Sequence, residues 1–151
     1  MRANPLELEI RRTFKCSKRK LFDAWSSPGL MSRWFFADSN RCQDSDVEVD
    51  FRVNGSYSLV MYFADGDSSR MHGTYTDIVR YNFIAFTWNS NHSNNTRVEL
   101  SFRELSPNRT ELRLLHQLLP DEDSRALHNN GWEACLGNLV LFIESEFGEA
   151  P

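Results

Sequence analysis

The chain of 151 residues has few cysteines, and they are widely spaced. Cys16, Cys42 and Cys135 are odd in number, and none lies in a Cys-x-x-Cys pair or at zinc-ligand spacing. A disulfide framework and a structural metal site are therefore not expected. Reduced thiols are the usual state of cysteines in the cytosol, so the cysteine content predicts a cytoplasmic protein that needs no metal or other cofactor.

Long apolar runs and basic clusters are also missing. No stretch approaches the roughly 18 consecutive apolar residues of a membrane span, and the first ten residues contain no apolar core of a signal peptide. Lysine and arginine total 17 against 21 acidic residues, and only residues 15–20 bring basic side chains together. Without a basic stripe, nucleic-acid binding is not expected. The length predicts a single domain over residues 1–151.

The sequence also lacks the common catalytic and nucleotide-binding motifs that would indicate an enzyme. It contains no GxSxG, P-loop, GxGxxG or HExxH, so we expect no catalytic residue, and a binding protein is favoured over an enzyme. The chain has four histidines, of which His92 and His128 have no carboxylate or cysteine at ligand spacing, while His72 and His116 fall in predicted strands and could point into a cavity. A hydrogen-bonded structural role is the favoured interpretation for each. A cyclase-type enzyme using His72 or His116 stays as a lower-ranked alternative.

The chain does contain one long amphipathic segment, residues 121–147. Apolar residues recur there at spacings of three and four, which predicts a helix of about 36 Å that would cross the whole domain. Cys135 falls in this rhythm, and burial would raise its pKa and make it inert. Gly131 and Gly137 inside the helix indicate a close backbone approach or a bend. The recurring apolar residues are Trp132, Cys135, Leu136, Leu139, Val140, Phe142, Ile143 and Phe147.

The preceding residues predict an α+β fold. Residues 6–14 alternate as a strand, and Ser17 and Pro28-Gly29 delimit a short helix that is followed by another at residues 30–34. Alternation then predicts antiparallel strands joined by turns, with Asn54-Gly55 as a tight hairpin and residues 41–45 and 89–95 as loops. A curved sheet of about six to seven strands wrapped around the long helix would leave a cavity between them. The later strands are expected near residues 47–53, 57–63, 71–79, 83–88, 98–102 and 112–116.

Five short motifs resemble one known family. They are Arg33-Trp34-Phe35, residues 50–57 (DFRVNGSY), residues 72–75 (HGTY), residues 86–88 (FTW) and residues 131–136 (GWEACL). In this order they resemble the activator of Hsp90 ATPase homologue (AHSA1-like) family of the START/Bet v 1-like superfamily, from about Leu8 to Phe147. The resemblance implies the helix-grip fold, and the superfamily includes lipid carriers, hormone receptors and polyketide cyclases. Asn54 and the turn at residues 80–82 depart from the family pattern.

Aromatic residues make up 13% of the chain and concentrate where the sheet and helices should meet. We therefore expect a small hydrophobic molecule to bind between the sheet and the last helix, with His116 orienting its polar end. The resemblance implies an alternative, an interaction module that modulates a chaperone ATPase. Exposed aromatics on the short helices would support a homodimer. The expected ligand-binding residues are Trp34, Tyr57, Met61, Tyr75, Trp88, His116, Trp132, Leu136, Leu139, Val140 and Ile143.

Overall fold

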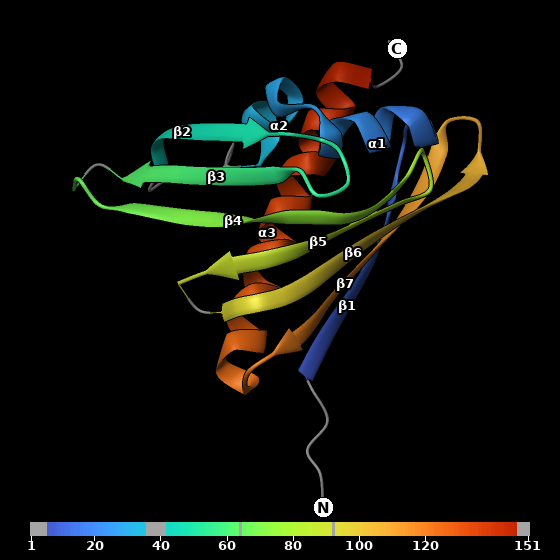
Figure 1. Ribbon diagram of the computed structural model, residues 1–151. Helices are drawn as coiled ribbons and strands as arrows, with labels where there is room; N and C mark the ends of the chain where they lie inside the picture. Colours follow the sequence, from blue (N-terminus) through green and yellow to red (C-terminus); the bar gives the residue numbers. More distant parts are fainter. Residues whose placement is uncertain (1–5, 36–41, 64, 92, 148–151) are drawn as a thin grey trace, which may run out of the picture.

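The computed structural model describes residues 6–35, 42–63, 65–91 and 93–147 (Figure 1). Phe36 and His92 lie outside these ranges. The chain folds as one strand, two short helices, six further strands and one long helix. The elements are β1 (Leu6–Phe14), α1 (Lys18–Ser26), α2 (Pro28–Trp34), β2 (Cys42–Val49), β3 (Ser56–Phe63), β4 (Ser68–Val79), β5 (Phe83–Ser90), β6 (Ser93–Ser106), β7 (Arg109–Leu119) and α3 (Glu122–Phe147).

Side-chain caps define the helix boundaries. The hydroxyl of Ser17 accepts a hydrogen bond from the Lys20 backbone N–H at 3.2 Å and begins α1. Ser27 ends α1 and caps α2, where Pro28 stands in the first turn and needs no N–H partner. Asp121 accepts from the Ser124 N–H at 2.8 Å and begins α3. The three helices predicted from the sequence are therefore confirmed.

The strands form a seven-stranded antiparallel sheet in the order β1-β7-β6-β5-β4-β3-β2. Consecutive strands from β2 to β7 pair as a meander, as predicted, and β1 pairs with β7 at the far edge. The sheet is strongly twisted, and α3 runs along one face while α1 and α2 cover one end (Figure 1). α3 contacts β1, β7 and α2, so the helix lies toward one side of the sheet. Strands β3 to β5 face the side of α3 that does not pack against β1 and β7.

Both predicted boundaries of β2 are wrong. β2 begins at Cys42, inside the predicted loop, because this edge strand is held by backbone pairing with β3 and needs no apolar alternation. It also ends at Val49 rather than at residue 53. Residues 50–55 form a longer turn in which Asn54 has a positive φ of 71°, a conformation that asparagine tolerates.

The predicted loop at residues 89–95 is much shorter in the structure. β5 continues to Ser90 and β6 starts at Ser93, so the polar residues there extend the two strands. The Asn89 side chain holds this hairpin, since it accepts from the Asn95 N–H at 2.8 Å and donates to the His72 carbonyl at 3.1 Å. Backbone pairing and amide side chains replace the apolar alternation that the prediction required.

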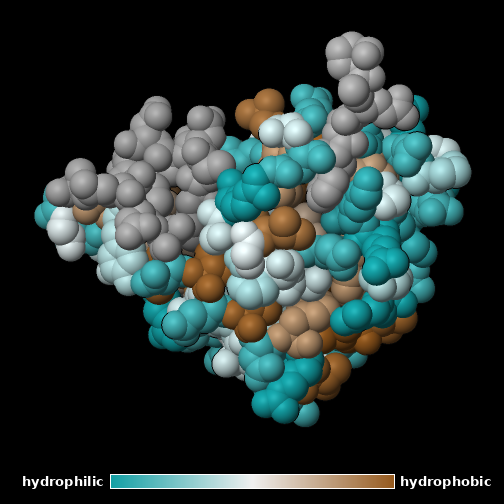
Figure 2. All heavy atoms as spheres, turned by 90° about the horizontal axis from the view of Figure 1, so that it is seen from above, coloured by the Kyte–Doolittle hydropathy of each residue, from teal (hydrophilic) through white to brown (hydrophobic). Residues whose placement is uncertain are grey.

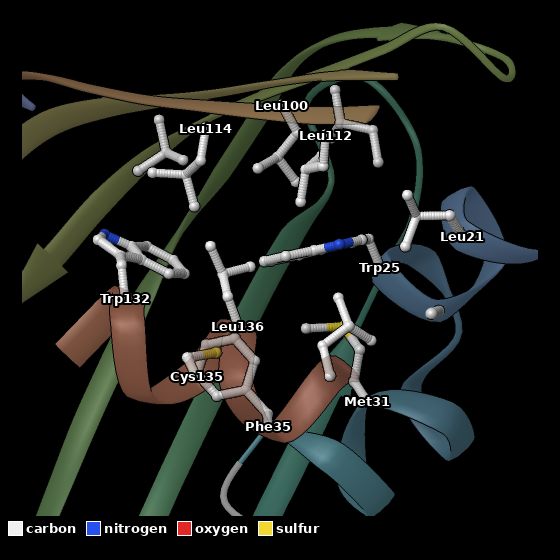
Figure 3. Packing of buried hydrophobic residues seen from close by; sticks show 14 of the residues in the cluster. Leu21, Trp25, Met31, Phe35, Leu100, Leu112, Leu114, Trp132, Cys135 and Leu136 are labelled. Atoms are coloured by element: carbon white, nitrogen blue, oxygen red, sulfur yellow. The ribbon is translucent and has the colours of Figure 1, made fainter. Parts of the chain in front are cut away.

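A core of aromatic and aliphatic side chains fills the space between the sheet and the three helices. Trp25 of α1 extends between Leu112 of the sheet and Met31 of α2, toward Leu136 of α3 (Figure 3). Trp25, Trp34 and Phe35 are all buried within the chain. The argument for a homodimer from exposed aromatics on the short helices therefore loses its basis in the described residues.

A candidate ligand-binding cleft beside the long helix

A cleft of about 940 Å³ lies between α3 and strands β3 to β5. The strand side contributes Met61, Ser69, Met71, Trp88 and Ser90. The helix side is supplied by residues between Leu127 and Leu141. Most of the lining is apolar, with a few polar groups, and the volume falls at the upper end of the range for small-molecule sites. The remaining lining residues are Arg12, Phe35, Asn91, His128, Gly131, Trp132, Ala134, Cys135, Gly137, Asn138 and Val140.

The cleft is lined by a second stripe of α3 that differs from its core-facing stripe. Residues Leu127, Gly131, Ala134, Asn138 and Leu141 follow one another at spacings of four and three, so they share one side of the helix. Leu127 is 51% and Leu141 61% exposed, which makes them two of the most exposed large apolar side chains described. Hydrophobic residues also reach the surface between hydrophilic ones in the view from above (Figure 2). The long helix thus uses one stripe for the core and offers another to the cleft.

Gly131 and Gly137 are not explained by a close backbone approach. A Cβ atom built on either glycine would meet nothing within 4 Å, and α3 is continuous from Glu122 to Phe147. The close-approach interpretation of the two glycines is therefore wrong, and a bend near Gly131 stays a prediction. Both line the cleft, where a missing side chain enlarges the open space.

We expect Gly131→Ala and Gly137→Ala each to stabilise the protein by about 0.5–1 kcal/mol. Alanine has the higher helix propensity, and the added methyl group would enter open space. Urea unfolding monitored by far-UV circular dichroism would measure the change. A loss of stability in either variant would show that the backbone there is confined.

The structure distributes the predicted ligand-binding residues between the cleft and the core. Met61, Trp88, Trp132 and Val140 line the cleft. Tyr57 and Tyr75 line a small internal void behind it, which Trp88 and Trp132 also border. The others are buried in the core or in a polar network beside it. These are Trp34, His116, Leu136, Leu139 and Ile143.

His116 is fully buried and bonded through both ring nitrogens. The Trp132 indole Nε1–H donates to His116 Nδ1 at 3.0 Å, so Nδ1 must be the unprotonated nitrogen. Nε2–H then donates to the Thr96 hydroxyl at 2.8 Å, and Thr96 donates to the Trp88 carbonyl at 2.8 Å. No ring nitrogen is left for a ligand, and the expectation that His116 orients a ligand is not met.

Burial lowers the pKa of His116 to about 3, with a smaller contribution from the neighbouring His128. The unfolded chain takes up a proton on this residue below about pH 6.5, while the folded chain stays neutral down to about pH 3. Stability from His116 is therefore complete above pH 6.5 and falls as the pH drops toward 3. We expect a loss of about 1.4 kcal/mol per pH unit in this window.

His116→Gln is the matched control, because the amide oxygen can accept from Trp132 and the amide N–H can donate to Thr96. Urea unfolding between pH 7.5 and 4.5 should show a weaker pH dependence in the variant than in the original chain. Carboxylates contribute equally to both proteins, so the difference isolates His116. Identical slopes would contradict a neutral, buried His116.

His128 joins the end of the cleft to a group of serines. Its Nδ1–H donates to the Ser124 carbonyl at 2.7 Å, which leaves Nε2 as an acceptor for the Ser90 and Ser93 hydroxyls at 3.4 and 3.3 Å. The imidazole rings of His116 and His128 are 4.9 Å apart. His128 therefore orders the hairpin between β5 and β6 against the start of α3.

His72 lies on the opposite face of the sheet. It alternates along β4 with Met71, which lines the cleft, so the two side chains leave the sheet on opposite faces. A second groove of about 670 Å³ crosses β2 to β5 there, and polar side chains such as Arg70 and Asn89 line it. His72 and His116 are thus separated by the sheet and cannot act together.

The cleft offers little reactive chemistry. Burial raises the pKa of the Cys135 thiol, which lines the cleft, as predicted. Cys16 is not part of the cleft lining, and burial raises its pKa to about 11. Arg12 pairs with Glu133 of α3 at 2.8 Å. Within the described ranges, no group of three or more His, Cys, Asp or Glu side chains could hold a metal ion, and no helix combines the length and apolar character needed to cross a membrane.

Sequence reasoning missed Met71, Leu127 and Leu141 as cleft residues. Met71 alternates with polar neighbours and would have been found by extending the parity of Tyr75 along the strand. Leu127 and Leu141 are 14 residues apart, so they fall on nearly the same side of a helix. Two leucines on one side of the helix, outside its core-facing stripe, were the signal in the sequence that could have indicated a second apolar surface.

Comparison with known proteins agrees with this architecture. The family model described as Activator of Hsp90 ATPase homolog 1-like protein matches residues 15–144. The chain belongs to this family. The resemblance seen in the sequence motifs is confirmed, and with it the helix-grip fold of seven antiparallel strands and a long final helix. No curated protein matches the chain.

Solved structures share the fold over nearly the whole chain. A protein of unknown function from Staphylococcus aureus is 19% identical, with a TM-score of 0.80 over 96% of this chain and 97% of the other. An uncharacterized protein from Rhizobium leguminosarum is 26% identical, with a TM-score of 0.77 over 94% and 96%. An HSP90 activator from Plasmodium falciparum is 24% identical, with a TM-score of 0.72 over 95% and 96%.

Proposed function

We propose that this protein binds a small, largely apolar molecule in the cleft between α3 and strands β3 to β5. The observation that carries the proposal is the cleft itself, with its volume of about 940 Å³ and its mainly apolar lining. Burying apolar surface of a ligand there would contribute roughly 25 cal/mol per Å². Of the residues that the sequence predicts to bind a ligand, we propose that four contact it in the cleft. These are Met61, Trp88, Trp132 and Val140.

The two exposed leucines of α3 support the proposal. Leu127 and Leu141 border the cleft, yet about half or more of each side chain is in contact with solvent. Two glycines between them leave further space, and replacing either by alanine is expected to improve the helix. A helix that gives up stability and exposes apolar side chains along one stripe is consistent with a binding surface.

The test uses N-phenyl-1-naphthylamine, a neutral apolar probe whose fluorescence rises in apolar surroundings. Titration of the full chain should give saturable binding. Leu141→Gln should weaken that binding roughly three- to tenfold, because it removes apolar contact area at the cleft. Glutamine is a good helix former, so the variant should keep α3 intact.

Leu105→Gln is the matched control. Leu105 lies on β6, is 43% exposed and does not line the cleft. Probe affinity should be unchanged in this variant. The absence of saturable binding to the original chain, or an equal loss in both variants, would overturn the proposal. Native mass spectrometry of the purified protein would add the mass of any molecule that copurifies.

A second candidate function is modulation of a chaperone ATPase. Its support is membership of a family named for an Hsp90 ATPase activator. The test measures ATP turnover by purified Hsp90 with and without the full chain. A dose-dependent change in turnover would favour this function. Unchanged turnover, together with no retention of Hsp90 by the immobilised chain, would count against it.

A further inference from the structure

Two of the four tryptophans have buried indole N–H groups without an acceptor. Trp25 is 3% and Trp88 6% exposed, and neither Nε1 has a hydrogen-bond partner in the part of the chain that the structure describes. The other two donate normally, Trp34 to a carbonyl oxygen at 2.9 Å and Trp132 to an imidazole nitrogen at 3.0 Å. A buried indole N–H usually has an acceptor, since an unpaired donor in an apolar interior is costly.

Both unpaired tryptophans line the same internal void. Its volume is about 20 Å³, enough for a water-sized group. The remaining lining contains no charged side chain, so the void is a mainly aromatic space bordered by the two tryptophans whose N–H groups are unpaired. The other lining residues are Met31, Phe35, Tyr57, Leu59, Tyr75, Phe86 and Trp132.

The void lies directly behind the apolar wall of the cleft. Three aromatic residues, Phe35, Trp88 and Trp132, line both spaces, so the void adjoins the cleft at these side chains. Trp132 packs against Trp88 at 4.9 Å and against Phe35 at 6.2 Å between ring centroids. A group of one or two atoms projecting from a molecule in the cleft is small enough for the void.

We propose that the molecule bound in the cleft carries a neutral hydrogen-bond acceptor, most simply a carbonyl oxygen, that enters this void and accepts from the indole N–H groups of Trp25 and Trp88. This inference rests on the proposed function and specifies its ligand class. A carboxylate fits poorly, because no cation lines the void to offset the loss of its hydration. A hydroxyl can accept as well, but its own proton would then need a partner in aromatic surroundings.

The experiment compares ketones with hydrocarbons of the same skeleton, beginning with benzophenone and diphenylmethane. The full chain is labelled with ¹⁵N, and the four indole N–H signals are assigned with Trp→Phe variants. Both members of a pair should shift the backbone amide signals of Leu127 and Leu141. Only the ketone should shift the indole signals of Trp25 and Trp88, and it should bind roughly three- to tenfold more tightly.

Indole signals that stay unmoved, with equal affinity for ketone and hydrocarbon in every pair that shifts the cleft amides, would overturn this inference and leave the proposed function standing. If no pair in a panel of such compounds shifts the cleft amides, the proposed function fails and this inference fails with it. The two failures are therefore distinguishable in one set of spectra.

Trp→Phe variants give a second, independent readout. Trp88→Phe and Trp25→Phe each remove an unpaired donor and keep an aromatic ring, so each should lower the ratio of ketone affinity to hydrocarbon affinity. Trp34→Phe is the control, because the Trp34 N–H already donates to the Ala24 carbonyl. The amide spectrum of each variant verifies the fold. A ketone preference that survives in both Trp25→Phe and Trp88→Phe would overturn the inference.

Discussion

Gly73→Ala is expected to lower the stability of the protein by about 3 kcal/mol or more. A Cβ atom at this position in β4 would lie 2.0 Å from the carbonyl oxygen of Thr87 in β5. The obstacle is backbone, so no rotamer change can relieve the clash, and β4 and β5 must separate locally. Urea unfolding at neutral pH would measure the loss.

The same place in the sheet is held by a tyrosine. Tyr57 pairs with Gly73 across β3 and β4, and its hydroxyl donates to the Thr87 carbonyl at 2.6 Å. Because Gly73 has no side chain, β4 and β5 can approach closely at the point where the Tyr57 hydroxyl reaches the Thr87 carbonyl. Because both changes disturb the Thr87 carbonyl, Gly73→Ala combined with Tyr57→Phe should cost less than the sum of the two single changes.

The helix glycines serve as the matched control for this prediction. Gly137→Ala adds the same methyl group where nothing lies within 4 Å, so its effect on stability should have the opposite sign. Equal effects of Gly73→Ala and Gly137→Ala would contradict the close approach of β4 and β5.

Trp132→Ala is expected to cost about 3–5 kcal/mol, the range for removing a large buried aromatic side chain. Trp132 is 3% exposed and packs against the rings of Trp25, Phe35 and Trp88. Its loss would also leave His116 Nδ1 without the N–H that now donates to it. Urea unfolding would measure the change in stability. At pH 7.5 the protonation of His116 does not contribute to this change.

Trp132→Phe separates packing from hydrogen bonding. Phenylalanine keeps an aromatic ring but cannot donate to His116, so we expect a smaller cost, about 1–3 kcal/mol. A similar loss for Trp132→Phe and Trp132→Ala would assign most of the effect to the hydrogen bond. A loss below about 1 kcal/mol in Trp132→Ala would mean that neighbouring side chains close the space.

Most of the secondary structure could be predicted because the patterns that specify it are local. The spacing of Trp132, Leu136 and Leu139 indicates a helix without reference to any other segment. Ser17 and Pro28 similarly mark helix boundaries through their own backbone and side-chain chemistry. Alternation and turn residues indicate antiparallel neighbours in the same way, and the family motifs add the helix-grip arrangement.

The wrong strand boundaries have a different origin. The start of β2 at Cys42 and the extension of β5 and β6 around residues 89–95 depend on backbone pairing with neighbouring strands. An edge strand or a polar hairpin can form such pairs without apolar side chains. Periodicity of hydrophobic residues therefore carries no signal for them.

The roles of the site residues could not be predicted from the sequence, because they depend on contacts between distant parts of the chain. His116 meets Thr96 and Trp132, which are 20 and 16 residues away, and these partners occupy both of its nitrogens. The sequence offered the histidine in an apolar strand, but only the tertiary contacts show that it belongs to a closed network.

The long helix shows most clearly which features the sequence determines and which depend on the tertiary structure. The sequence by itself determined that residues 121–147 form an amphipathic helix and that a sheet of matching length must cover it. The tertiary structure decided that α3 packs toward β1 and β7, so that its second stripe borders a cleft. Helical periodicity shows which residues share a side of a helix, but it does not show which sides the sheet covers and which it leaves open.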